Sequence, residues 1–156
     1  MNQSAYSAFT LKFEGIVRQL RTSIRIETEN YYLEGTALWD TGASCSCISQ
    51  KVANDLRLIP TGRQMVLTPS GENIVNTYLV NVILPNNVTV KDVAVCDSDI
   101  GKQGLDMLIG MDIISCGDMS ITNYNGKTFF SFRVPSQQAV DFVMQSAVKG
   151  RKVKRK

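Results

Sequence analysis

The chain has 156 residues, of which 44% are hydrophobic and 20% charged, as expected for one globular domain with a sizeable core. Six basic residues lie beyond position 148, and subtracting them from the net charge of +3 leaves about −3 for the rest, so we expect no nucleic-acid surface there. The chain has no histidine, which excludes Ser–His and Cys–His nucleophile systems and histidine-ligated metal sites.

Three strand-like stretches occupy the first 40 residues. Phe9–Val17 predicts a short strand within an N-terminal extension, residues 1–19. Leu20–Thr28 alternates apolar or Thr residues with polar ones and predicts a half-buried strand. Thr36–Asp40 reads as a buried strand that ends at an aspartate. The first residues lack the basic start and apolar core of a secretory signal, and no apolar run approaches the about 20 residues of a membrane span, so we expect a cytoplasmic protein.

Asp40 is followed directly by Thr41 and Gly42. An aspartate that leaves a buried strand is costly unless it is hydrogen-bonded or used in chemistry. Gly42 permits a sharp turn or the close approach of another backbone. This tripeptide alone favours a turn-capping aspartate over a catalytic one, so the rest of the chain has to decide between the two interpretations.

A short helix and a long hairpin come next. Ser49 is the predicted N-cap of a helix over Lys51–Leu58. Arg63–Thr68 and Asn73–Leu84 are predicted strands, and the second is long enough for the hairpin to project from the body. The turn between them contains Thr68, Pro69, Ser70 and Gly71.

A further strand comes next, and after it a stretch that repeats the shape of the region around Asp40. Val88–Val95 predicts a strand, and a break in its alternation at Lys91-Asp92 permits a bulge. Leu105–Gly110 is a second largely apolar run that ends in glycine. Asp112 then occupies the position expected for the N-cap of a short helix.

The C-terminal part predicts a hairpin, a helix and a tail. Met119–Thr122 and Lys127–Val134 are strands joined around Asn125-Gly126, a strong hairpin signal. Residues 135–149 predict an amphipathic helix, capped at Ser136, whose apolar stripe we expect to pack on the body or on a partner. The stripe consists of Val140, Val143, Met144, Ala147 and Val148. The basic tail, residues 150–156, is predicted to be disordered, and weak contact with an anionic surface is the alternative.

The four cysteines lack the paired CxxC spacing of a four-thiolate zinc site. We therefore expect free thiols and neither a metal nor a cofactor, with a metal or redox role as the alternative. They are Cys45, Cys47, Cys96 and Cys116.

Taken together, these motifs resemble the retropepsin-like aspartic proteases. The resemblance rests on Asp40-Thr41-Gly42-Ala43, the following helix, a hairpin tipped near Ser70-Gly71, and Leu108-Ile109-Gly110, and it covers residues 20–134. The continuation Met111-Asp112 is similar to the cellular and bacterial branch, including the ubiquitin-shuttle type. Ser44 stands where the viral enzymes have an acidic residue that pairs with an arginine, so that ion pair is absent here.

This resemblance implies a mainly β fold with a closed, β-barrel-like sheet, a flap hairpin and short helices. It also implies an endopeptidase in which two Asp40 carboxylates, one from each chain of a homodimer, share a proton and activate a water. Thr41 and Gly42 would support the dyad, and Leu108, Ile109 and Gly110 would pack beneath it. A polypeptide substrate would contact Gly42, Ala43, Thr68, Pro69, Ser70 and Gly71.

Two other functions compete with this one. The first is a catalytically silent retropepsin fold that serves as a dimerisation or peptide-binding module. The second is another carboxylate enzyme, such as a glycosidase that uses Asp40 with Asp106 or Asp112. Trp39 is the only tryptophan, so the sequence lacks the aromatic platforms that sugar-binding clefts often carry.

Overall fold

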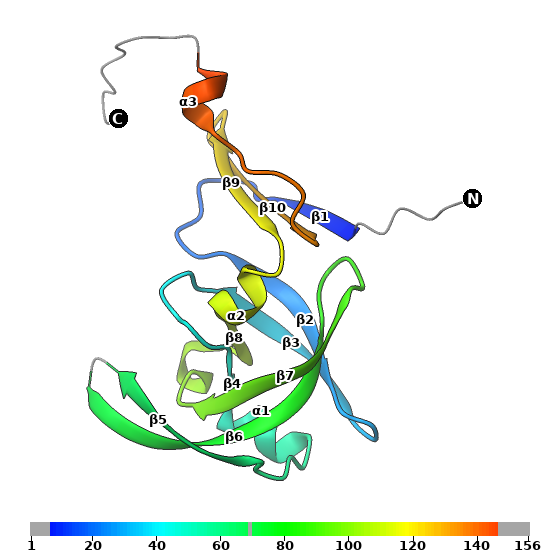
Figure 1. The fold of residues 1–156 in the computed structure, drawn as a ribbon, viewed down its shortest axis with the longest axis vertical. Coiled ribbons are helices and arrows are strands. Elements are labelled where there is room, and N and C mark those ends of the chain that lie inside the picture. The colour runs from blue at the N-terminus through cyan, green and yellow to red at the C-terminus, as the bar shows by residue number, and fades with distance from the viewer. Residues whose placement is uncertain (1–6, 69, 147–156) are drawn as a thin grey trace.

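The computed structural model describes residues 7–68 and 70–146. Ten strands and three short helices make up most of this part of the chain, together with a single 3-10 turn at Gly101–Gln103 (Figure 1). The strands are β1 (Ser7–Lys12), β2 (Arg21–Glu27), β3 (Tyr32–Trp39), β4 (Cys47–Ser49), β5 (Gly62–Thr68), β6 (Gly71–Ile83), β7 (Thr89–Ser98), β8 (Met107–Ile109), β9 (Asp118–Tyr124) and β10 (Lys127–Val134). The helices are α1 (Gln50–Asp55), α2 (Met111–Ile114) and α3 (Phe142–Gln145).

Six strands form a closed sheet. Their order is β2-β3-β8-β4-β7-β6, and pairing between β6 and β2 closes the ring. β5 pairs with β6, and this hairpin projects from the ring (Figure 1). The predicted mainly β class, with a closed sheet and short helices, is confirmed. The ring encloses apolar side chains that solvent does not reach, among them Ile26, Ile48, Val82, Met107 and Ile109.

Alternation of side chains explains the strands of the ring. In β2, Thr22, Ile24 and Ile26 are buried, while Arg21, Ser23 and Arg25 are exposed, because successive side chains point to opposite faces of a strand. The predicted bulge at Lys91-Asp92 is also confirmed. Val80 pairs with Val93 and Val82 with Val90, so the two residues between the valines of β7 face one residue of β6.

A second sheet, β1-β10-β9, joins the two ends of the described chain. Phe9 of β1 pairs with Phe132 of β10. The aromatic side chains of Phe9 and Phe132 both pack on Trp39. The indole Nε1–H of Trp39 donates to the Thr22 hydroxyl at 3.0 Å. The centroid of Phe130 lies 5.1 Å from that of Trp39 in an edge-to-face arrangement. This aromatic cluster fixes the strand that leads into Asp40 against the second sheet.

The C-terminal helix differs from the prediction. In the described residues it is the single turn α3, which begins after Asp141 rather than Ser136. The Ser136 hydroxyl instead donates to Asp118, which also accepts from Arg133 on β10. Val143 and Met144 are each 83% exposed, so this part of the stripe does not pack on the body. Ala147, Val148 and the basic tail lie outside the described residues.

A membrane-spanning helix is not found in residues 7–68 and 70–146: none of the helices there has the length and apolar character that crossing a bilayer requires.

Candidate active site

Asp40 lies at the end of β3, where two parallel strands stop together. β3 pairs with β8 in the register Leu38↔Leu108 and Trp39↔Ile109. The amide of Asp40 then donates to the Ile109 carbonyl at 2.9 Å, which extends the pairing by one residue. The buried strand therefore delivers Asp40 to the surface at a fixed position, and the side chain is half-buried there.

The turn after Asp40 leaves part of its carboxylate free. Oδ1 accepts from the Gly42 amide at 2.8 Å, and the main-chain carbonyl of Asp40 accepts from the Ala43 amide at 3.2 Å. Among the described residues, no hydrogen bond reaches Oδ2. Thr41 and Gly42 are exposed. The turn-capping role and a chemical role are thus compatible, because one oxygen fixes the turn and the other accepts no hydrogen bond from the described residues.

Gly110 holds the base of this turn. Its amide donates to the Ser46 hydroxyl at 3.0 Å, and the next amide, of Met111, donates to the Ala43 carbonyl at 2.8 Å. A Cβ atom at Gly110 would lie 2.7 Å from the carbonyl carbon and oxygen of Cys45. Leu108, Ile109 and Gly110 therefore run beside and beneath the Asp40 turn, and the contact at Gly110 is too close for a side chain.

Ser46 and Asp112 form a link that the sequence did not reveal. Asp112 accepts from the Ser46 amide at 2.9 Å and from the Ser46 hydroxyl at 2.7 Å. It also accepts from the amide of Ile113, but the N-cap of α2 is Gly110, so the predicted N-cap position of Asp112 was wrong. The one feature of the sequence that could have pointed to this link is a polar residue, Ser46, between two cysteines in a stretch that is buried.

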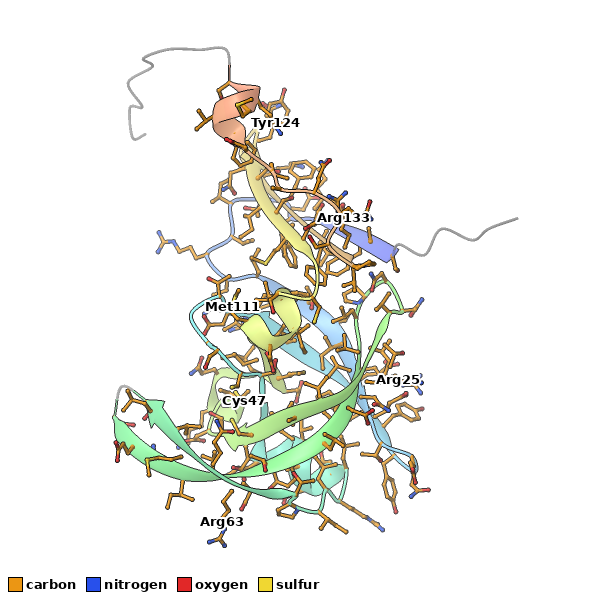
Figure 2. The ribbon with its side chains drawn as sticks, in the orientation of Figure 1. Arg25, Cys47, Arg63, Met111, Tyr124 and Arg133 are labelled. Atoms are coloured by element: carbon orange, nitrogen blue, oxygen red, sulfur yellow. The ribbon has the colours of Figure 1, made fainter. Side chains whose placement is uncertain are left out.

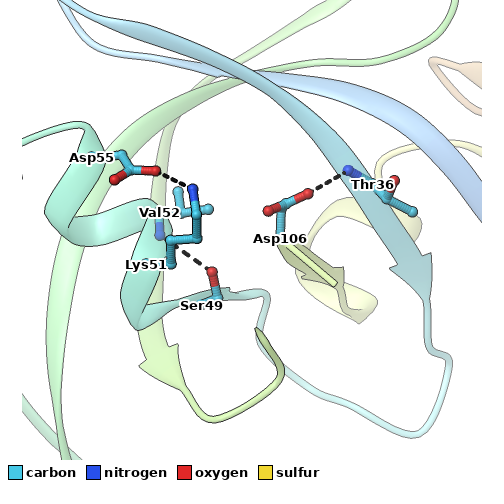
Figure 3. Close-up of polar contacts among 6 residues, drawn as sticks. All are labelled: Thr36, Ser49, Lys51, Val52, Asp55 and Asp106. Carbon is cyan, nitrogen blue, oxygen red and sulfur yellow. Dashed lines mark hydrogen bonds and ion pairs between the residues drawn. The ribbon is translucent and has the colours of Figure 1, made fainter. Parts of the chain in front are cut away.

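Asp106 has a structural role in the neighbouring strand pair. Its carboxylate accepts from the Thr36 amide at 2.9 Å (Figure 3), and a Cβ atom at Gly35 would lie 2.5 Å from this carboxylate. Figure 3 also shows the Ser49 hydroxyl accepting from the Val52 amide, which confirms the predicted N-cap of α1. Neither Asp106 nor Asp112 suits a glycosidase pair with Asp40. Both oxygens of Asp112 accept hydrogen bonds, and Asp106 lies beside Thr36, before β3 reaches the Asp40 turn.

The tip of the β5–β6 hairpin is held by its own side chains. The Thr68 hydroxyl lies 2.9 Å from that of Ser70 and 3.0 Å from the Gly71 carbonyl oxygen. Gly71 has a φ of 117°, a conformation that residues with a Cβ rarely adopt. Pro69 lies outside the described residues. The three described tip residues are remote in sequence from Asp40, and the hairpin extends outward (Figure 1).

Comparison with known proteins decides the family. The profile of the family described as gag-polyprotein putative aspartyl protease matches residues 27–116. The chain belongs to this aspartyl protease family. The match contains the Asp40 turn, the projecting hairpin and Gly110, which are the parts that carried the resemblance to the retropepsin-like proteases.

Solved structures of aspartyl proteases have a similar fold. A retropepsin-like aspartic protease from Rickettsia conorii is 16% identical, with a TM-score of 0.54 over 86% of this chain and 98% of that one. The EIAV protease in complex with the inhibitor HBY-793 is 18% identical, with a TM-score of 0.48 over 62% of this chain and 86% of that one. No curated protein sequence matches the chain. The Rickettsia structure supports the predicted retropepsin-like fold.

A cavity of the protein lies near the Asp40 turn. It has a volume of about 400 Å³ and lies between the base of the β5–β6 hairpin, β7 and α2. Its walls include Cys45, Gln64, Thr77, Cys96 and Asp112. Asp40 is not one of the described residues that line it. In the single chain, the Asp40 carboxylate therefore lies outside this open pocket.

Proposed function

We propose that the chain is an aspartic endopeptidase that works as a homodimer, with Asp40 from each of two chains at one shared site. The observation that carries this proposal is the Asp40 carboxylate itself. It stands at the end of a buried strand in an Asp-Thr-Gly turn, with one oxygen bound by Gly42 and the other without a partner among the described residues. This arrangement occurs in a chain of an aspartyl protease family.

The need for a second chain follows from the neighbouring carboxylates. Aspartic proteases use two carboxylates that share one proton, since like charges at about 3 Å cannot both ionise. Both oxygens of Asp112 are engaged by Ser46, and Asp106 lies beside Thr36, away from the Asp40 turn. A twofold axis beside the Asp40 turn supplies an equivalent carboxylate without any further residue.

The proposed mechanism uses groups of the chain alone. One Asp40 carboxylate takes a proton from a water, which attacks the scissile carbonyl of the peptide. The other, protonated carboxyl donates to that carbonyl oxygen and stabilises the developing charge. Thr41 and Gly42 support the pair across the axis. Residues 20–134 form the proposed protease domain.

Substrate would bind as an extended strand between the Asp40 turns and the hairpin tips. Gly42 and Ala43 offer main-chain groups beneath the peptide, and the tip residues Thr68 to Gly71 close over it, as in β-strand addition. The exposed position of Thr41 and Gly42 supports this arrangement, because a second chain and a peptide can both reach the turn.

The decisive experiment compares wild-type protein with Asp40→Asn. An unfolded polypeptide is incubated with each at acidic and neutral pH, with and without a peptide inhibitor that carries a hydroxyl isostere. We expect inhibitor-sensitive cleavage by the wild type and its loss in the variant. Asp99→Asn is the matched control, because Asp99 is an exposed carboxylate paired with Lys102 and should leave activity unchanged.

Equal cleavage by Asp40→Asn would overturn the proposal. Binding of the inhibitor without cleavage by the wild type would instead favour the silent peptide-binding module.

A further inference from the structure

Cys47 and Cys96 face each other across two neighbouring strands. Cys47 of β4 and Cys96 of β7 are direct partners in a parallel pair, and Cys47 lies in the interior where these strands meet (Figure 2). Partners in a parallel pair point to the same face, with strands about 4.8 Å apart. That spacing falls within the Cα separation of about 4.4–6.8 Å that a disulfide requires.

The two thiols differ in access. Cys47 is only 8% exposed. Cys96 is half-buried, and its side of β7 lines the cavity of about 400 Å³ together with Gln64 and Thr77. A small molecule that enters the cavity therefore meets Cys96, whereas Cys47 lies behind it.

The contact between the two thiols and their different burial shift their pKa values in opposite directions. A hydrogen bond from the Cys47 thiol lowers the pKa of Cys96 to about 7, although partial burial and the charges of Asp97 and Asp112 act in the opposite direction. The hydrogen bond to Cys96, together with burial, raises the pKa of Cys47 well above its usual range. Because the thiolate is the nucleophile, Cys96 is the attacking residue and Cys47 its protonated partner.

We propose that Cys96 is a covalent modification site for low-molecular-weight disulfides that enter the cavity, and that Cys47 resolves the product into a Cys47–Cys96 disulfide. The Cys96 thiolate attacks the small disulfide, forms a mixed disulfide and releases one small thiolate. Cys47 then attacks the Cys96 sulfur, and its proton passes to the second small thiol as that leaves. In total two protein thiols are oxidised and one small disulfide is reduced to two thiols.

The second step becomes easier once the first has occurred. The negative charge of Cys96 is one cause of the raised pKa of Cys47, and it disappears when Cys96 enters the mixed disulfide. The cross-link would join β4 to β7 next to Ser46, the residue that holds Gly110 and Asp112. The site therefore lies beside the support of the Asp40 turn, but its chemistry does not use Asp40.

The test uses oxidised glutathione as the probe on the full chain at pH 7. Peptides are mapped by mass spectrometry over time, after free thiols are blocked. We expect glutathione to appear on Cys96 and then to give way to a peptide pair linked through Cys47 and Cys96. The same time course in Asp40→Asn separates this chemistry from the proposed proteolysis and prevents self-cleavage during the incubation.

Two variants separate the roles. In Cys47→Ala the mixed disulfide at Cys96 should persist, and it should form about threefold more slowly, because the hydrogen bond that favours the thiolate is gone. In Cys96→Ser, Cys47 should stay unmodified, because it is buried and has lost its direct partner. The exposed Cys45 also lines the cavity, and any glutathione on it is scored as a separate site. Cys116→Ser is the matched control: it removes an exposed thiol outside the pair and should change neither step.

A wild-type map without the Cys47–Cys96 link would overturn the proposal. So would glutathione on Cys47 in Cys96→Ser. Should Cys47→Ala fail to fold, the wild-type and Cys96→Ser maps still decide the question. In urea, where the strands separate, the preference for Cys96 should disappear.

Discussion

Three aspartates around the closed sheet differ in their hydrogen-bond partners and in their positions. Asp106 holds the amide of Thr36, and Asp112 holds both the amide and the hydroxyl of Ser46. Asp40 accepts a single bond, from the Gly42 amide. A carboxylate that is not fully engaged by the fold retains lone pairs for a substrate or a water. Asp106 also accepts only one side-chain bond, but it lies beside Thr36, within the length of β3. Asp40 lies in the turn after that strand, and its position together with its free lone pairs singles it out.

The Ser46 hydroxyl should contribute measurably to stability. Ser46→Ala leaves the buried Gly110 amide without its acceptor and removes one donor to Asp112. An unsatisfied buried amide costs about 1–3 kcal/mol, so the free energy of unfolding in urea should fall by that amount. Ser44→Ala is the control, because Ser44 is exposed in the same turn. Equal unfolding midpoints for the two variants would contradict the role of Ser46.

Gly110 should tolerate no side chain. Gly110→Ala places a Cβ atom 2.7 Å from the backbone of Cys45, so the Asp40 turn has to move away from β8. Overpacking of this kind costs about 1–3 kcal/mol, and a displaced turn should lower proteolytic activity as well. Gly15→Ala is the matched control, since nothing lies within 4 Å of its Cβ position. Thermal unfolding and the cleavage assay measure both effects, and a variant as stable as Gly15→Ala would refute the prediction.

At the candidate site, the sequence predicted the features that are formed by residues adjacent in the chain. Asp40, Thr41 and Gly42 are adjacent, so a buried strand followed by a glycine turn could be read directly. The link from Ser46 to Asp112 spans 66 residues and exists only because β8 lies between β3 and β4 in the closed sheet. A hydroxyl residue between two cysteines carries no sign of a partner so far along the chain.

At the scale of elements, strands were predicted better than helices. Alternating side chains located β2, and Asn125-Gly126 located the turn between β9 and β10. The C-terminal apolar stripe instead predicted a helix over residues 135–149, whereas the described helix is one turn. Short helices are marginal without tertiary packing, and the exposed Val143 and Met144 receive none from the described body.

Asp118 should make the attachment of the segment after β10 sensitive to acid. Its carboxylate accepts from Arg133, Ser136 and the Gln137 amide, and these bonds hold the pKa of Asp118 well below its usual range. A carboxyl group with a depressed folded pKa stabilises the fold above its unfolded pKa of about 3.9, and the effect is lost as pH falls below that value.

Asp118→Asn should therefore lose less stability than wild type as the pH falls below about 4. Urea unfolding midpoints measured through this range give the slope for each protein. Ser136→Ala, which removes one donor and keeps the carboxyl group, should show an intermediate slope. Indistinguishable slopes for wild type and Asp118→Asn would rule out this contribution.

At the scale of the molecule, closure of the sheet depends on contacts that no local pattern specifies. β1 pairs with β10, so Thr10 meets Ser131 across 121 positions of sequence. The pairing of β6 with β2 is also long in range. The sequence predicted most of these strands, and the resemblance to a known family implied a closed sheet. It did not give the pairing of β1 with β10, because β1 lies outside the residues that the resemblance covers. Periodicity tells which face of a strand is buried, and it does not tell which strand lies beside it.

The proposed shared site predicts that an inactive chain suppresses an active one. After subunit exchange, Asp40→Asn chains should pair at random with wild-type chains, and every mixed dimer would hold one carboxylate instead of two. Activity per wild-type chain should then fall to about one half at equal amounts and to about one tenth at a ninefold excess of the variant. In mixtures of wild type with Asp99→Asn, which keeps Asp40, the total activity should instead rise with the amount of variant. Exchange is checked by co-purification of differently tagged chains, and undiminished wild-type activity in exchanged mixtures would show that each chain carries a complete site.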